Sequence, residues 1–201
     1  MRALLLLLAT SCAAPLPGDG MPEAAGGAGE FTMLLGQRDF QDDAGWGDLD
    51  GQSSVGVIWS LEPEDTFLGW EASLLGSWED TTVLTPDGPE PTADLDSTTL
   101  EGSIGVIKSV RLGERFRPYL GAGVSIIHVE LEVPLGNSSV LLQEDDDFLG
   151  VYARAGLLFQ WSESSFFGFD VRALEGGSGS ITGIDYDTDY VQASLVFGAS
   201  F

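Results

Sequence analysis

Residues 149–161, LGVYARAGLLFQW, decide the fold, because apolar side chains occupy every second position along the whole segment. One face carries Leu149, Val151, Ala153, Ala155, Leu157, Phe159 and Trp161, and the other carries Tyr152, Arg154, Gly156 and Gln160. A period of two is that of a β-strand whose two faces meet different surroundings. The segment therefore predicts a strand with an apolar face and a polar face, and the polar face has a charge at its centre.

Seven further segments repeat this alternation, and most are close to the roughly 9–11 residues that a tilted strand needs to cross a membrane. Together with the first, they cover residues 31–38, 54–61, 68–78, 99–106, 119–126, 149–161, 167–173 and 191–201. Helices are disfavoured, because glycine recurs inside the segments and β-branched and aromatic residues dominate them.

The polar faces carry charged residues in mid-strand, namely Arg38, Glu71, Glu101, Arg154, Asp170 and Arg172. A soluble barrel or sandwich would turn these residues to water and bury the apolar faces. A membrane barrel would turn the apolar faces to lipid and enclose the charges, which persist in an interior only when they are paired. Because the set includes both arginines and acids, we expect an interior ion-pair network.

The connections between segments favour the membrane barrel, because short and long ones alternate. The short connections are 62–67, 111–117 and 162–165, and the long ones are 39–53, 79–98, 129–147 and 175–189. Short periplasmic turns that alternate with longer outer loops are typical of outer-membrane barrels. The sequence therefore predicts an all-β, eight-stranded antiparallel transmembrane β-barrel, and its long outer loops are acidic and lack Lys and Arg.

Aromatic residues on the apolar faces fall near the ends of the segments. With the orientation above, we expect them to form girdles at the two membrane boundaries, where amphipathic rings are favoured. The alternative is that they are core aromatics of a sandwich. The predicted girdle consists of Phe31, Trp59, Trp70, Trp78, Trp161, Phe167 and Phe201.

The N-terminal residues predict export. Residues 1–14, MRALLLLLATSCAA, have the charged start and apolar centre of a signal peptide, and 15–29 are a Pro/Gly/Ala-rich linker before a barrel at 30–201. An ordinary signal-peptidase site and a lipobox ending at Cys12 both remain open. Cys12 is the one cysteine, so no intramolecular disulfide forms.

The charge excludes one class of partner. The chain has 32 acidic and 8 basic residues and a net charge of −24, which excludes nucleic acid, since that ligand requires clustered Lys and Arg. The hydrophobic content of 43% and aromatic content of 10% predict a folded chain rather than a disordered one.

Three stretches resemble the OmpA/OmpW-like superfamily of small outer-membrane barrels: RPYLGAGVSI at 117–126, GFDVRAL at 168–174 and VQASLVFGASF at 191–201. The resemblance implies a location in the outer membrane, contact with its lipids and a monomer. It also implies that the barrel-assembly machinery recognises the last strand, which ends in Phe201.

No catalytic constellation is evident, and we expect no cofactor and no metal site. His128, the one histidine, falls on the lipid-facing parity, and Glu130 stands where barrel deacylases have a serine. We expect a non-enzymatic outer-membrane protein, structural or surface-interacting. The alternatives are a narrow channel or carrier for small apolar molecules and a lipid-modifying barrel enzyme.

Overall fold

The computed structural model describes residues 27–41, 51–63, 66–84, 92–113, 115–134, 141–181 and 184–201. The predicted signal peptide, Cys12 and the linker up to residue 26 lie outside the described residues. Within them, no helix is long and apolar enough to cross a membrane.

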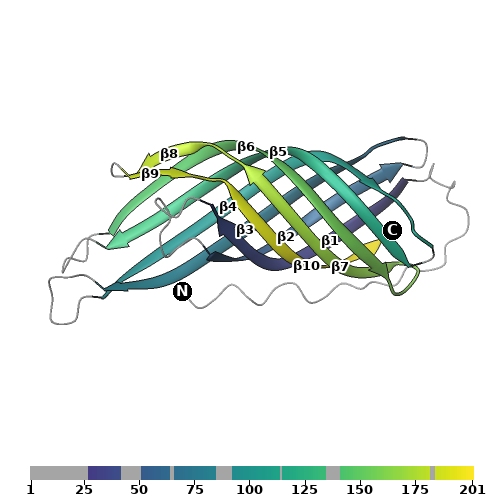
Figure 1. Ribbon diagram of the computed structural model, residues 1–201, viewed down its shortest axis with the longest axis horizontal. Helices are drawn as coiled ribbons and strands as arrows, with labels where there is room; N and C mark the ends of the chain where they lie inside the picture. Colours follow the sequence, from purple (N-terminus) through teal and green to yellow (C-terminus); the bar gives the residue numbers. More distant parts are fainter. Residues whose placement is uncertain are drawn as a thin grey trace, which may run out of the picture.

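Eight strands form one closed antiparallel barrel in the order β1-β10-β7-β6-β5-β4-β3-β2, which confirms the predicted fold (Figure 1). The two remaining strands, β8 and β9, form a separate hairpin between β7 and β10. The strands are β1 Gly27–Phe40, β2 Gly51–Pro63, β3 Gly69–Leu84, β4 Thr92–Ser109, β5 Phe116–Pro134, β6 Leu141–Gln160, β7 Ser165–Glu175, β8 Ser178–Ile181, β9 Ile184–Asp187 and β10 Tyr190–Ser200.

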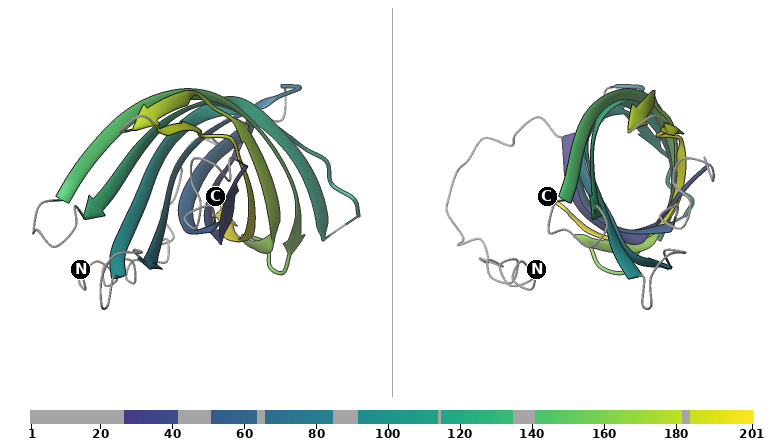
Figure 2. Two further views of the ribbon diagram at one scale, coloured as in Figure 1. Left: turned by 60° about the vertical axis from the view of Figure 1, so that its left-hand side comes forward. Right: turned by 90° about the vertical axis from the view of Figure 1, so that its left-hand side faces the viewer.

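The barrel closes where β1 pairs with β10, and an end-on view shows the complete ring (Figure 2). The pairing extends past the strand ends, because Gly29 and Phe201 exchange two backbone hydrogen bonds of 3.1 and 2.8 Å. On its other side β1 pairs with β2 from Gly27 onward, so the last three residues of the predicted linker are strand.

The prediction of long outer loops needs correction, because much of their length is strand. β3 and β4 remain paired as far as Leu84 and Thr92, and β5 and β6 as far as Pro134 and Leu141. These pairs extend past the neighbouring strands at one end of the barrel (Figure 1). Apolar and acidic residues still alternate in parts of these extensions, as in VELEV at 129–133, a strand signal that the sequence interpretation assigned to a loop. Backbone pairing also continues through the acidic run at 144–147, because the barrel has already set the register.

The exposed fractions place the apolar faces outside. Val151 and Leu195 are 56% and 47% exposed, whereas Glu101 and Arg172 are 0% and 1% exposed. In water such an exterior would be a continuous apolar patch around the molecule, which soluble monomers do not carry. The apolar exterior therefore faces lipid.

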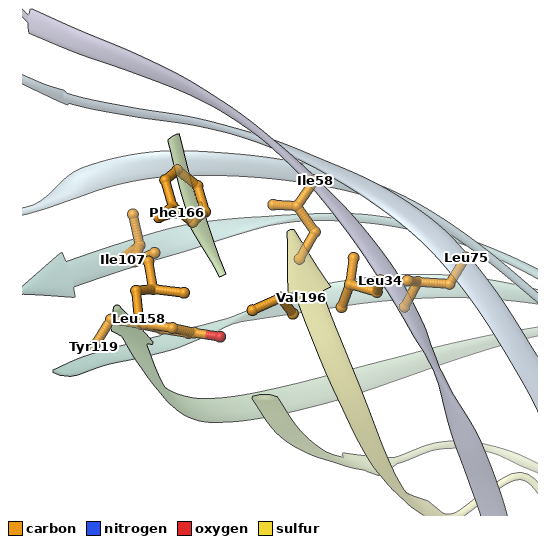
Figure 3. Packing of buried hydrophobic residues seen from close by; sticks show 8 residues of the cluster. All are labelled: Leu34, Ile58, Leu75, Ile107, Tyr119, Leu158, Phe166 and Val196. Carbon is orange, nitrogen blue, oxygen red and sulfur yellow. The ribbon is translucent and has the colours of Figure 1, made fainter. Parts of the chain in front are cut away.

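The interior is not polar throughout, contrary to the prediction. Apolar side chains from all eight strands of the barrel meet inside it on the same parity as the charges, and Figure 3 shows their packing. This cluster contains Leu34, Ile58, Leu75, Ile107, Tyr119, Leu158, Phe166 and Val196. A second cluster contains Phe40, Ile127, Val129, Phe148, Tyr152, Leu174 and Tyr190. Charged and apolar side chains both occur on the inward face of the strands. For this reason the sequence pattern of that face does not reveal a packed apolar core.

Interior glycines leave room for these rings, and Gly105 provides a test. A Cβ added at Gly105 would collide with the Tyr152 hydroxyl and with the backbone oxygen of Ala122. We expect Gly105→Ala to lower the free energy of unfolding by about 1–3 kcal/mol, the usual cost of overpacking. Urea titration in lipid vesicles would measure it. Gly102 is the matched control on the outer face of the same strand, because an added Cβ meets nothing within 4 Å; an equal cost for Gly102→Ala would contradict the explanation.

Candidate functional site

Glu101 is the centre of a buried polar cluster in the lumen. Its carboxylate accepts hydrogen bonds from Arg38 at 2.9 Å, from Ser125 at 2.9 Å and from the Tyr190 hydroxyl at 2.5 Å. Arg172 forms a second ion pair with the same carboxylate. The side chains of Glu101, Arg38 and Arg172 are at most 1% exposed, so one buried carboxylate faces two buried guanidinium groups.

Arg38 is held by uncharged partners as well as by Glu101. It donates to Thr99 at 3.1 Å and to Gln192 at 3.1 and 3.2 Å, and its guanidinium lies 3.9 Å from the centre of the Tyr190 ring. Charge-assisted hydrogen bonds and cation–π contacts are strong in a dry interior. They offset part of the cost of enclosing the second positive charge.

Arg154 is the centre of a second buried cluster. It lies 3.1 Å from Asp170 and 3.5 Å from Glu71, so here one guanidinium faces two carboxylates. Tyr119 donates to Asp170, and Tyr152 donates to Glu71 at 2.7 Å. The excess negative charge of this cluster balances the excess positive charge around Glu101.

Tyr152 joins the two clusters. Its hydroxyl binds Glu71, and the face of its ring lies 3.7 Å from the guanidinium of Arg172. The structure thus brings all six residues of the predicted network, Arg38, Glu71, Glu101, Arg154, Asp170 and Arg172, into two neighbouring clusters.

A further ion pair, outside the two clusters, lies at the short-turn end, and the sequence interpretation missed it. Arg117 donates through both terminal nitrogens to the Glu30 carboxylate, with one distance of 2.7 Å, and Ser200 donates to Glu30 at 3.0 Å. The signal was present, because Arg117 shares the inward parity of Tyr119. It was overlooked because Arg117 was assigned to a turn and Glu30 to the edge of the linker.

The tyrosines of the lumen were also missed as partners. Tyr119 and Tyr152 fall on the polar faces of their predicted segments, and this parity could have identified them. Tyr190 lies one residue before the last predicted segment, so its inward position became visible only in the structure.

These groups project into the lumen. The cavity beside Arg117, Tyr119 and Arg154 measures about 10 Å³, about the space of one water molecule. The structure does not bring Ser125 and His128 together, because Ser125 donates to Glu101 inside the barrel while His128 pairs with Asp147 at 2.9 Å, with exposed side chains. The chemistry of the interior is ion pairing that holds the wall together.

The seven predicted girdle residues all point outward and are 38–76% exposed. Four rings form a continuous outward group near the short turns: Phe159 lies 5.4 Å from Phe116 and 5.1 Å from Phe167, and Trp161 lies 6.3 Å from Phe167. Phe116 and the 80% exposed Phe67 belong to the same boundary but were not predicted.

Phe201 ends the closing strand and is 76% exposed. Its recognition by the barrel-assembly machinery stays a prediction.

No protein-family model and no curated protein matches the chain. Among solved structures, the outer membrane protein OprG from Pseudomonas aeruginosa is 15% identical with a TM-score of 0.62, and the match covers 88% of this chain and 97% of that one. Neisserial surface protein A is 12% identical with a TM-score of 0.54, over 87% of this chain and 97% of that one. Ail of Yersinia pestis is 12% identical with a TM-score of 0.52, over 87% of this chain and 99% of that one.

Identities this low show a shared fold rather than a shared function. The fold is that of the small outer-membrane β-barrels, which confirms the predicted resemblance at the level of architecture. With its lipid-facing exterior, the chain has the architecture of a transmembrane barrel, and these structural neighbours are proteins of the outer membrane.

Proposed function

We propose that this chain is a non-enzymatic surface protein whose plugged barrel holds acidic β-hairpins above the outer membrane for contact with cationic partners. The observation that carries the proposal is the extension of the β3–β4 and β5–β6 pairs beyond the strand segments predicted to cross the membrane. Residues 79–98 and 129–147 include these extensions and contain twelve acidic residues and no Lys or Arg.

The filled lumen favours a role on the surface over transport. Two charged clusters, the Arg117–Glu30 pair and two apolar clusters occupy the interior. A barrel of eight strands encloses about enough space for its own side chains. A channel would require several of these buried ion pairs to open, and each opening leaves charges without partners.

The charge of the hairpins indicates the kind of partner. Ail has been crystallised with the heparin analogue sucrose octasulfate, which is a polyanion. The acidic hairpins of this chain would repel such a ligand. This chain would therefore prefer cationic ligands, although its fold is similar. We expect polycations such as Lys-rich peptides to bind, with an affinity that falls as salt is added.

Binding to vesicles that contain the full protein tests the proposal. We expect a fluorescent oligolysine peptide to bind and heparin not to bind. The variant Glu144→Gln, Asp145→Asn, Asp146→Asn removes three charges from one hairpin and should weaken peptide binding severalfold. Glu163→Gln, in the turn at the opposite end, is the control and should leave it unchanged.

Two results would contradict the proposal. One is equal affinity for heparin and oligolysine. The other is a steady conductance of the protein in planar bilayers, which would favour the narrow channel instead.

A further inference from the structure

The exposed basic side chains of the described barrel gather at one place. Of the basic residues in the described ranges, four are buried in ion pairs, namely Arg38, Arg117, Arg154 and Arg172. The others, Lys108, Arg111 and Arg115, lie at the β4–β5 turn at the short-turn end of the barrel. In a chain with a net charge of −24, this turn is a local reversal of sign.

A cavity of about 590 Å³ lies between this turn and the β6–β7 turn. Its walls include Arg111, Arg115 and Arg117 on one side, and Gln160, Trp161 and Glu163 on the other. The two walls are joined, because the backbone N–H of Gln160 donates to the carbonyl oxygen of Arg115 at 2.8 Å. The cavity is therefore held by the fold and does not depend on the side chains alone.

The guanidinium groups in this cavity have donors to spare. Among the described residues, neither Arg111 nor Arg115 forms an ion pair, whereas Lys108, outside the cavity, lies 3.9 Å from Glu62. Arg117 is more than nine-tenths buried, and its Nε has no hydrogen-bond partner in the described part of the chain. Within the described ranges, Arg111 and Arg115 thus have no counter-ion, and Glu163 is the one carboxylate among the residues that line the cavity.

The membrane side of the cavity is aromatic. Phe116 and Trp161 line it, and they belong to the outward group of rings at the short-turn boundary. Rings of this kind lie at the level of lipid headgroups. A ligand that suits both walls carries an anionic group for the arginines and hydrocarbon for the rings.

We propose that this cavity binds the phosphate of an anionic phospholipid from the periplasmic leaflet of the outer membrane. Arg111 and Arg115 contact the phosphate oxygens, which guanidinium groups bind well. Arg117, whose terminal nitrogens bind Glu30, lies buried behind them, and the acyl chains lie along Phe116 and Trp161. Basic pockets beside membrane segments recognise anionic headgroups by this chemistry.

Native mass spectrometry of the full protein, extracted from membranes and titrated with phosphatidylglycerol or phosphatidylcholine, tests the site. We expect preferential retention of phosphatidylglycerol. Arg115→Gln should weaken its binding about tenfold, because a charge-assisted hydrogen bond is lost. Arg111→Gln combined with Arg115→Gln should reduce it to the level of phosphatidylcholine. Heat-modifiable gel mobility would show that these turn variants are folded.

Lys108→Gln is the matched control, since it removes a positive charge from the same end of the barrel but outside the cavity. Equal weakening by Lys108→Gln would overturn the proposal, because it would indicate general attraction to a positive surface. Equal retention of the two lipids would also overturn it. Displacement of the lipid by millimolar inorganic phosphate would show a site for a soluble anion, contrary to the lipid assignment.

Discussion

Replacing Glu101 with glutamine is expected to destabilise the barrel by about 3–5 kcal/mol, the largest single effect in the lumen. The carboxylate holds both Arg38 and Arg172, which are buried to 99% or more. An amide at this position keeps the shape but leaves two positive charges without a counter-ion in a dry interior. Neither arginine can release a proton to escape the penalty, because guanidinium groups stay charged.

Urea unfolding in lipid vesicles, followed by tryptophan fluorescence or by gel mobility, would measure this loss. Glu175→Gln is the control, because Glu175 ends β7 with an exposed side chain, and its effect should stay within about 0.5 kcal/mol. A loss of similar size for both variants would show that the Glu101 cluster is not a dry, paired site.

A rescue experiment separates the cost of breaking the Glu101 cluster from the net contribution of that cluster to stability. The combined variant Arg38→Met, Glu101→Leu, Arg172→Met, Tyr190→Phe replaces the charged groups with apolar ones of similar size. We expect its stability to return to within about 1–2 kcal/mol of the native chain, because buried ion pairs contribute little over an apolar filling. A quadruple variant as unstable as Glu101→Gln would contradict this account.

Placing an arginine at Leu195 is expected to cost about 2–4 kcal/mol, because the side chain then lies in the middle of the bilayer. Leu195 sits at the centre of β10, between Leu35 of β1 and Phe169 of β7, and is 47% exposed. The stability falls because a charge moves from water into hydrocarbon when the barrel folds. The same unfolding titration in vesicles would measure it.

Thr98→Arg is the matched control for Leu195→Arg. Thr98 also points outward, but it pairs with Trp78, one of the predicted girdle residues. There the cost should fall to about 0–1 kcal/mol. Equal costs at the two positions, or a Leu195→Arg protein that stays folded in buffer without detergent, would contradict the lipid-facing assignment.

Much of the architecture could be predicted from the sequence, because the strand signal is local. The alternation around Arg154 and Leu195 assigns each side chain to one of two faces without knowledge of the partner strands. The charge at Glu101 then indicates which face is enclosed, since a membrane exterior does not tolerate it. The six network residues and the seven girdle residues follow from that parity.

The extents of the strands could not be predicted, since pairing outside the membrane needs no apolar pattern. β5 continues to Pro134 because β6 supplies its hydrogen-bond partners residue by residue, even opposite the acidic run at 144–147 of β6. The apolar interior was missed for a related reason. Leu34 and Ile58 lie on the polar parity, and only the closed wall shows that this parity also forms a packed core.

The amino-acid sequence alone determined that this chain makes eight strands with one apolar face, that most of them approach the length that spans a membrane, and that charges lie on their other face. The tertiary structure decided which charges meet, because Arg38 and Glu101 are 63 residues apart and Glu30 and Arg117 are 87 apart. The physical reason is that the face of the strand on which a side chain lies is set by its position along the chain. The residue with which it pairs depends on the register and closure of the whole barrel.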